Sequence, residues 1–303
     1  MSAAIKEDGE EVMLCASCGT AEGDDIKLKR CNACYLVRYC SVKCQKDHWP
    51  KHKRECKKRA AELRDEILFK QPESSHYGDC PICCLPLPLD PKKSNMMTCC
   101  SKIICLGCTY ANQKREWHQK REHECAFCRE PLSKTKEEIN EQLMKRVEAN
   151  DPVAIREMGM RKCNEGDCKS ALEYWTKAAA LGVAGAHYEL SISYREGQGV
   201  EKDGKKELFH LTEAAIAGHP KARHNLGCLE WGNGRMDRAI KHWTIAAKLG
   251  NNDSLDILRK AHRDGFVSKE DFTAALRGYQ AAIDATKSPN REEGDKLMMQ
   301  QRV

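Results

Sequence analysis

The start of the chain carries eight residues of the two types that bind zinc most readily, arranged in short pairs. They are Cys15, Cys18, Cys31, Cys34, Cys40, Cys44, His52 and Cys56. Thiolate sulfurs and imidazole nitrogens suit tetrahedral Zn²⁺, and eight such ligands fill two closed sites. The spacing leaves two pairings open. Sequential pairing gives two independent fingers, whereas alternating pairing ties the ends of one compact module together.

A second set of cysteines follows at once. It consists of Cys80, Cys83, Cys99, Cys100, Cys105, Cys108, Cys125 and Cys128. The two sets use 15 of the 19 cysteines and one histidine, enough for four zinc ions. A structural zinc contributes on the order of 10 kcal/mol to folding. The first half of the chain is therefore predicted to fold on metal rather than on a large apolar core.

Composition supports small modules and helical repeats. The chain has 303 residues, of which 41% are hydrophobic, 32% charged and 6% aromatic, and a length of this kind predicts two or three domains. It shows no run of about 18 apolar residues, so no membrane span is expected. The acidic start, 1–11, does not look like a signal peptide. Unpaired cysteines in such number then favour an intracellular protein of the cytosol or nucleus.

The net charge of +6 is concentrated in one basic cluster. Its members are Lys51, Lys53, Arg54, Lys57, Lys58 and Arg59. Such a cluster is compatible with a regulator that binds nucleic acid. Acidic residues interleave directly downstream, which favours a solvated helix face instead. Nucleic acid is therefore an unfavoured partner.

The string YCSVKCQKDHWPKHKREC, from Tyr39 to Cys56, resembles the MYND zinc finger. The resemblance implies interleaved ligands. Cys15, Cys18, Cys40 and Cys44 would hold one zinc, and Cys31, Cys34, His52 and Cys56 the other. MYND modules generally bind short peptides of partner proteins. They also accompany SET methyltransferase domains, but the rest of this chain shows nothing similar to one.

The second set resembles a RING finger, whose two zinc ions are also held in alternation. Lys102 stands where many RING fingers have a histidine ligand, and an ammonium group cannot bind zinc. With the adjacent cysteines as ligands, Cys80, Cys83, Cys105 and Cys108 would hold one zinc, and Cys99, Cys100, Cys125 and Cys128 the other. The last site requires a strained turn. His118 or His123 could substitute there, or that site could lack zinc.

The RING resemblance also implies an activity without a covalent catalytic residue. RING ligases hold a ubiquitin-charged conjugating enzyme in a reactive geometry. In that family the enzyme docks on an apolar residue between the first two ligands, here Ile82, and an arginine after the last ligand, here Arg129, contacts it and ubiquitin. Ala126 replaces the proline that usually stands two residues before the last ligand in that family. The alternative is a zinc-stabilised module without ligase activity.

The last half of the chain is repetitive. AAALG at 178–182 recurs as AAIAG at 214–218 and AAKLG at 246–250, with spacings of 36 and 32 residues. These periods predict helical hairpins stacked into a solenoid, each ended by glycine. GQGVEKD at 197–203 resembles the loop of a Sel1-like repeat. Stacked Sel1 hairpins generally hold other proteins on a concave surface.

The predicted fold is multidomain, with two cross-braced zinc modules before an all-α Sel1/TPR-like solenoid. The predicted segments are a disordered tail over 1–10, a MYND finger over 11–60, a charged helical linker over 61–78, a RING-like finger over 79–133, a connecting helix over 134–150, repeats with a capping helix over 151–286, and a frayed tail over 287–303. This order of modules resembles a family of MYND, RING-like and Sel1-repeat proteins expanded in unicellular algae. Three functions remain: a ubiquitin ligase with protein substrates, a non-enzymatic adaptor between protein partners, and, least favoured, the nucleic-acid-binding regulator.

Overall fold

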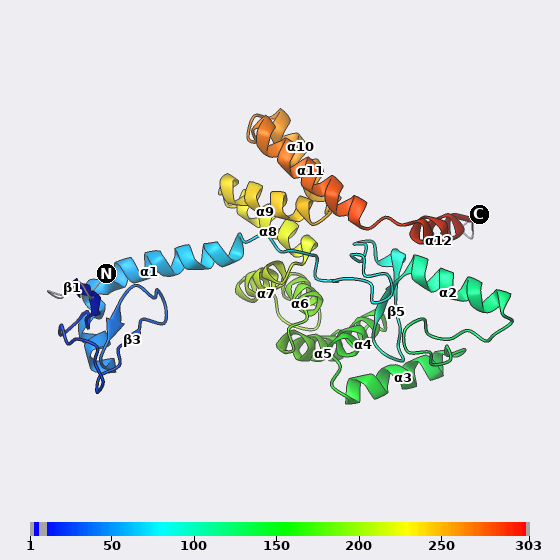
Figure 1. Ribbon diagram of the computed structural model, residues 1–303, viewed down its shortest axis with the longest axis horizontal. Helices are drawn as coiled ribbons and strands as arrows, with labels where there is room; N and C mark the ends of the chain where they lie inside the picture. The colour runs from blue at the N-terminus through cyan, green and yellow to red at the C-terminus, as the bar shows by residue number, and fades with distance from the viewer. Residues whose placement is uncertain (1–2, 6–10, 301–303) are drawn as a thin grey trace. The chain divides into compact units, whose positions relative to one another are not determined.

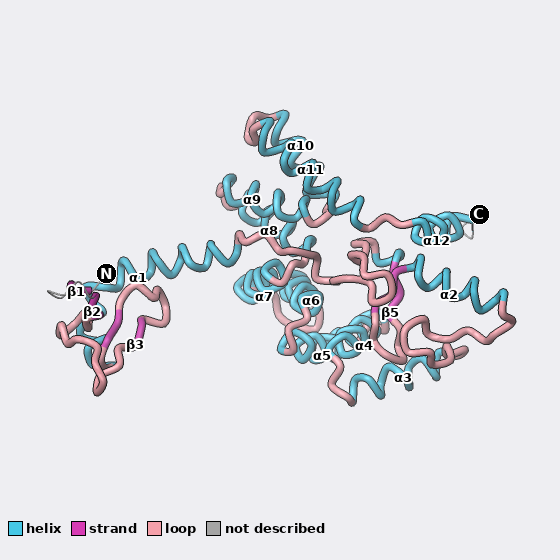
Figure 2. The backbone as a smooth tube through the Cα atoms, in the orientation of Figure 1, coloured by secondary structure: helices cyan, strands magenta, loops and turns pink. Residues whose placement is uncertain are grey.

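The structure is a computed structural model that describes residues 3–5 and 11–300, and it divides the chain into two compact units. The N-terminal unit is 1–70 and the C-terminal unit is 71–303 (Figure 1). Figure 2 shows that helices and loops dominate both units, with only short strands. No helix among the described residues has the length and apolar character that crossing a bilayer requires. The predicted disordered tail over 1–10 lies outside the described residues except for 3–5.

The N-terminal unit contains two short hairpins and one long helix. Strand β1 pairs antiparallel with β2, and β3 with β4. Their bounds are β1 Ala3–Ile5, β2 Glu11–Met13, β3 Lys29–Arg30 and β4 Arg38–Tyr39. Helix α1, Val42–Leu68, follows β4 directly, and the Ser41 side chain caps it by accepting from the Cys44 backbone N–H at 3.2 Å. This cap fixes the helix start beside the ligands of the finger.

Helix α1 differs from the prediction of a separate linker helix. It runs without a break for 27 residues, from the finger into the segment predicted as linker, although Pro50 lies inside it. Past the finger its exposed face carries ion pairs from Arg59 to Glu62 and Glu66 at 3.1 and 2.9 Å. The helix ends at Leu68, before Pro72, so 69–78 is a non-helical segment. No capping or breaking residue separates finger from linker, which explains the continuity.

The C-terminal unit begins with the second finger. A short 3₁₀ turn, Pro91–Lys93, leads into the antiparallel pair β5, Ser94–Met96, and β6, Ile103–Cys105. Helix α2, Leu106–His118, follows immediately. The interior of this finger is small: besides its cysteines, only Leu87 and Ile104 are buried apolar side chains. A core of this size cannot stabilise the module alone, which is consistent with metal-dependent folding.

The remaining helices form stacked hairpins (Figure 1). Their bounds are α3 Lys136–Glu148, α4 Pro152–Asn164, α5 Cys168–Ala180, α6 Ala184–Glu196, α7 Gly204–Ile216, α8 Pro220–Gly232, α9 Met236–Lys248, α10 Asn252–Arg263 and α11 Lys269–Ala285. The predicted terminators Gly182, Gly218 and Gly250 have φ of +85°, +80° and +90°. These left-handed residues end the second helix of each hairpin, as the repeated motif predicted.

The hairpins interlock through paired small and large residues. A Cβ on Gly159 would lie 2.5 Å from the Trp175 indole nitrogen, and one on Gly227 would lie 2.4 Å from that of Trp243. The equivalent positions of the middle repeat are Ser191 and Leu211, both buried. In the hairpins of α4 with α5 and of α8 with α9, the glycine therefore makes room for the indole ring of the facing helix.

The predicted frayed tail over 287–303 is wrong for the part of it that the structure describes. Residues Pro289–Gln300 form helix α12, which packs on α2 of the second finger. The cause is a tertiary contact: a Cβ on Gly107 would lie 2.6 Å from the Arg291 backbone nitrogen, so only glycine allows this approach. Residues 301–303 lie outside the described part of the chain.

Candidate metal centres and interaction surfaces

The structure groups the sixteen predicted ligands into four clusters, each with its ligand atoms within 4.8 Å of one another. In the first finger the clusters are Cys15/Cys18/Cys40/Cys44 and Cys31/Cys34/His52/Cys56. Sulfur atoms of Cys18 and Cys40 lie 3.5 Å apart, and those of Cys31 and Cys56 lie 3.7 Å apart. The sets alternate along the chain, so the two clusters tie together the hairpin β3–β4 and the start of α1.

The second finger repeats this arrangement. Its clusters are Cys80/Cys83/Cys105/Cys108 and Cys99/Cys100/Cys125/Cys128. Sulfur atoms of Cys83 and Cys105 are 3.8 Å apart, as are those of Cys100 and Cys125. The sequence left open a substitution by His118 or His123, but neither belongs to the fourth cluster. His123 instead lies 3.0 Å from a carboxylate oxygen of buried Glu116.

The cluster geometry fits zinc. With Zn–S bonds of about 2.3 Å, a tetrahedral site places its sulfur atoms about 3.8 Å apart. The observed sulfur separations of 3.4 to 3.8 Å are close to that value. In the mixed cluster the His52 Nε2 atom lies 3.2 Å from the Cys34 sulfur, and His52 is only 3% exposed. His48 contacts the Tyr39 hydroxyl at 3.1 Å and lies outside the cluster. The donor sets are thus compatible with zinc at several sites.

Four of the five Cys-x-x-Cys pairs form a knuckle, which is a tight turn closed just after the second cysteine of the pair. The residue after that cysteine donates its backbone N–H to the carbonyl of the first cysteine. These residues are Gly19, Tyr35, Cys84 and Arg129, with N···O distances of 2.9, 2.9, 2.9 and 3.0 Å. Their φ angles are +75°, +56°, +55° and +66°. The left-handed turn brings both sulfurs to the same side. Cys84, which belongs to none of the four clusters, is exposed on this turn.

The adjacent cysteines of the fourth cluster are joined by a tighter turn. Ser101, directly after Cys100, is buried at φ +57° and donates its backbone N–H to the Met97 carbonyl at 2.7 Å. The strain predicted for neighbouring ligands therefore lies at Ser101. Its hydroxyl accepts a hydrogen bond from Arg146 of α3 at 3.4 Å. Lys102, in the place of a missing histidine, lies over the Phe127 ring at 5.6 Å.

Hydrogen bonds prepare several thiols for metal binding. A hydrogen bond from the Thr20 hydroxyl, with its backbone N–H, lowers the pKa of Cys18 to about 6. The Cys105 thiol donates to Cys80, and with backbone N–H groups it lowers the pKa of Cys80 to about 4 despite burial. Zinc binds thiolates, so a lowered pKa reduces the cost of losing the proton at Cys18 and Cys80. The hydrogen bond between Cys105 and Cys80 raises the pKa of the Cys105 thiol in turn, so that ligand gives up its proton less readily.

Among the described residues, the second finger is held to the rest of the C-terminal unit in at least three places. At its start, the His76 backbone N–H donates to the Gly218 carbonyl at 3.0 Å, and the His76 ring stacks on His219 with centroids 4.1 Å apart. At the fourth cluster, the Thr98 hydroxyl donates to Gln142 of α3 at 2.8 Å. The third attachment is helix α12. The finger therefore belongs structurally to the C-terminal unit.

The two residues predicted to dock a conjugating enzyme lie on the two outer knuckles of the second finger. Ile82 is 42% exposed on the first knuckle, and Arg129 is exposed on the last. The sequence did not reveal the group that orients Arg129. Its Nη1 atom donates to the Asn112 side-chain oxygen at 2.9 Å, and Asn112 in turn donates to Glu116 at 2.6 Å. No motif in the sequence links α2 to the last knuckle, so only the fold shows this chain of hydrogen bonds.

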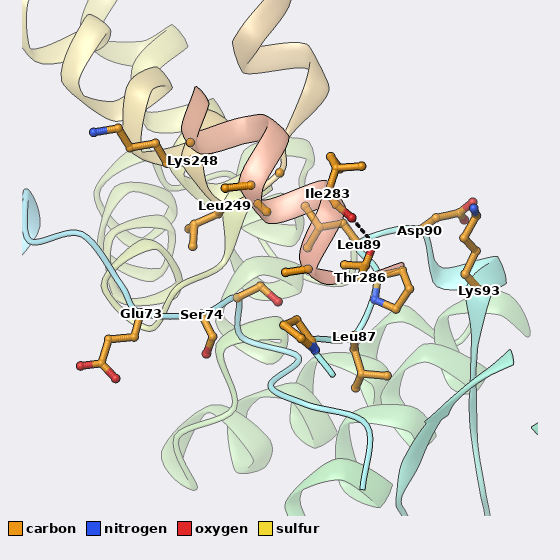
Figure 3. Close-up of a pocket in the computed structure, with 18 residues that line it drawn as sticks. Glu73, Ser74, Leu87, Leu89, Asp90, Lys93, Lys248, Leu249, Ile283 and Thr286 are labelled. Carbon is orange, nitrogen blue, oxygen red and sulfur yellow. Dashed lines mark hydrogen bonds between the residues drawn. The ribbon is translucent and has the colours of Figure 1, made fainter. Parts of the chain in front are cut away.

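An apolar pocket of about 520 Å³ lies in the C-terminal unit, between the segment after the first knuckle and helices α9 and α11. Figure 3 shows Leu87, Leu89, Leu249 and Ile283 around it. The charged groups of Glu73 and Lys248 extend outward on one side of the view. Volume and lining suit a short peptide segment or a few apolar side chains.

Comparison with known proteins identifies one module by family. Residues 15–56 match the model of the MYND finger family, so this chain is a zinc-finger protein with a MYND finger followed by helical repeats. A SET domain and MYND-type zinc finger protein 6 from Schizosaccharomyces pombe is 44% identical over 55 residues, which are 18% of this chain and 11% of that protein. Human histone-lysine N-methyltransferase SMYD3 is 64% identical over 31 residues, or 10% of this chain and 7% of that protein. The chain thus covers only about a tenth of these curated relatives.

Two solved structures resemble the repeats. A Sel1 repeat protein from Oxalobacter formigenes matches with a TM-score of 0.44 and 27% identity, over 51% of this chain and 66% of that one. The protective antigen c5321 from uropathogenic Escherichia coli, described as having an SLR fold, matches with a TM-score of 0.40 and 28% identity, over 48% and 33% of the two chains.

Proposed function

We propose that this protein is a RING-type ubiquitin ligase that recruits a charged conjugating enzyme through its second finger and holds protein substrates on its MYND and repeat surfaces. The observation that carries the proposal is the cross-braced finger with an exposed isoleucine on one outer knuckle and an exposed arginine on the other, Ile82 and Arg129. Zinc supplies structural crosslinks in this finger. The chain's own contribution is to position an enzyme that already carries the reactive thioester.

The hydrogen bonds around Arg129 support this role. Asn112 holds one guanidinium nitrogen, while the side chain remains exposed. Buried Glu116 fixes Asn112 and also accepts from the Glu124 backbone N–H at 3.3 Å. An arginine oriented before binding loses less conformational entropy when it contacts a partner. Preorganisation of this kind suits a residue that must contact an enzyme and ubiquitin together.

Discharge of ubiquitin from a panel of charged conjugating enzymes tests the proposal. Stimulation by the zinc-loaded chain should fall at least tenfold in Ile82→Ala and in Arg129→Ala. Matched controls are Ile67→Ala, another exposed isoleucine, and Arg121→Ala, an arginine of the same finger in an exposed ion pair with Glu124. Both controls should keep the stimulation. Equal rates in all five proteins would refute enzyme docking at these two residues.

The second candidate is a non-enzymatic adaptor between protein partners. Two observations favour it. Ala126 stands where proline usually precedes the last ligand by two residues, and the apolar pocket of about 520 Å³ offers a binding surface whose lining includes neither Ile82 nor Arg129. The same discharge experiment separates the candidates. If no enzyme is discharged by protein shown to hold its zinc, the adaptor is supported and the ligase is refuted.

Methyl transfer is not proposed, although two relatives with MYND fingers are named for SET domains or methyltransferase activity. Their similarity to this chain is limited to short stretches of 55 and 31 residues. A shared finger indicates shared protein binding at most, because activity lies in the site and not in an accompanying module.

A further inference from the structure

The C-terminal helix inserts one arginine beside a zinc cluster of the second finger. Arg291, in the first turn of α12, is only 6% exposed. Its Nη2 atom donates to the Cys83 sulfur at 3.3 Å and to the Leu85 carbonyl at 3.1 Å. Its Nη1 atom donates to the Pro86 carbonyl at 2.7 Å and to the Thr286 carbonyl at 2.8 Å. Both terminal nitrogens of the guanidinium group therefore contact the first knuckle or the residues directly after it.

Residues of the finger and of α12 both contribute to this contact. Gly107, between two ligands of the same cluster, is the residue whose missing side chain makes room for the Arg291 backbone. Two ion pairs flank the buried arginine: Lys93 with Asp295 and Lys114 with Glu293, each at 2.7 Å. The helix is thus anchored at several points of the finger, and Arg291 is the anchor that reaches a ligand atom.

The charge of this cluster explains why an arginine belongs there. Four thiolates around one Zn²⁺ carry a net charge of about −2, and a buried charge of that size requires compensation. Arginine keeps its positive charge at any physiological pH, and its planar fork can satisfy several acceptors at once. Hydrogen bonds to metal ligands from outside the coordination sphere fix ligand orientation and raise metal affinity about 10- to 100-fold.

We propose that Arg291 is a positioning residue for the zinc held by Cys80, Cys83, Cys105 and Cys108, and that α12 is thereby an integral part of the second finger. The helix comes from the far end of the chain, so zinc retention in this cluster depends on the C-terminal segment. The other clusters have no contact with Arg291 among the described hydrogen bonds and do not share this dependence.

Zinc release from the full-length, zinc-loaded chain tests the proposal. Excess chelator is added, and cysteines that become free are alkylated and identified by mass spectrometry at successive times. In Arg291→Met, Cys83 and Cys105 should become reactive about 10- to 100-fold faster than in the wild type. Cys31 and Cys56 should keep their rates and serve as the internal control. Glu293→Gln, which breaks only an exposed contact of the same helix, should change no rate more than about twofold.

A spectroscopic measurement separates a direct effect on the ligand from simple loss of helix packing. In the cadmium-loaded chain, one of four cadmium NMR resonances should shift in Arg291→Lys, which keeps the charge and changes the hydrogen bond to Cys83. No resonance should shift in Glu293→Gln. If Arg291→Met releases metal from every cluster alike, Arg291→Lys decides the matter: a shift confined to one site supports the proposal. Unchanged resonances in Arg291→Lys, or unchanged Cys83 reactivity in a folded Arg291→Met protein, would overturn it.

Discussion

The two zinc fingers share one ligand logic and differ in what holds them in shape. Each has two interleaved clusters and left-handed turns after its knuckles. The first finger is contained in the N-terminal unit, where α1 supplies three of its own ligands, Cys44, His52 and Cys56. The second finger is part of the C-terminal unit, where 71–78, α3 and α12 all contact it.

This difference has a physical consequence for stability. Structural zinc stabilises a module that can close its own coordination shell, whatever follows it in the chain. A module that also uses polar contacts from distant segments should hold its zinc more weakly when those segments are unfolded. The first finger should therefore keep its zinc whatever the state of the rest of the chain, whereas the second should keep its full zinc affinity only while its supporting helices are folded.

The largest expected effect breaks the first finger alone. Cys40→Ala removes one ligand of four and should cost that module most of the roughly 10 kcal/mol that a structural zinc contributes. Zinc content should fall, and proteolysis should occur within 15–56, while the C-terminal unit keeps its helical signal. Cys84→Ala is the matched control, because its exposed thiol lies outside every cluster. Equal zinc loss in both variants would contradict the ligand sets.

Excision sharpens the contrast between the two fingers. The fragment 1–70 should bind zinc as tightly as the full chain does at its first two clusters. The fragment 79–133 lacks α3 and α12 and should release zinc about 10- to 100-fold faster than the same clusters in the full chain. Fragment 71–303, which retains both helices, is the control and should match the full chain. Equal release rates from 79–133 and 71–303 would show that the second finger is also independent.

Acid should weaken the attachment at the start of the second finger. Burial, with the positive charge of Arg156, lowers the pKa of His76 to about 3. As the pH falls below about 6.5, folded His76 stays neutral, whereas His76 of the unfolded chain binds a proton. The contribution of His76 to the free energy of unfolding therefore declines as the pH falls from about 6.5 toward 3. Between about pH 7.5 and 5.5 this amounts to about 1.4 kcal/mol.

Urea unfolding of the helices at both pH values measures this loss. It should be smaller by about 1.4 kcal/mol in His76→Leu than in the wild type. His118→Leu replaces an exposed histidine of α2 and should leave the wild-type difference unchanged. If His76→Leu shows the full wild-type loss, the stacked pair with His219 does not hold the segment.

The smallest expected effect concerns the contact with α3. Thr98→Val removes the hydrogen bond to Gln142 and should cost about 1 kcal/mol, or about fivefold faster zinc release from the cluster with Cys99 and Cys100. Thr212→Val is the control, because that hydroxyl bonds only its own helix, at the Leu208 carbonyl. If both variants released zinc at the same rate, the contact with α3 would not stabilise this cluster.

Several features followed from the sequence because they depend on local spacing. Ligand pairs separated by two residues predicted the metal clusters, and the AAxxG motifs predicted helix ends at Gly182, Gly218 and Gly250. The sequence also predicted a solenoid and a MYND finger. The contacts between successive helices confirm the solenoid, and the family match confirms the MYND finger. Periodicity and ligand chemistry are properties of neighbouring residues, so one sequence suffices to read them.

Only the tertiary structure decided how the modules depend on one another. Arg291 and Cys83 are 208 positions apart, and a polar, charged segment such as 289–300 gives no periodic signal of where it packs. A helix of that composition is marginal in isolation and is stabilised by its contacts. The same holds for Asn112 beside Arg129 and for His76 on His219. Sequence spacing fixed the ligands, whereas long-range packing, which no local pattern encodes, selected the helices that support them.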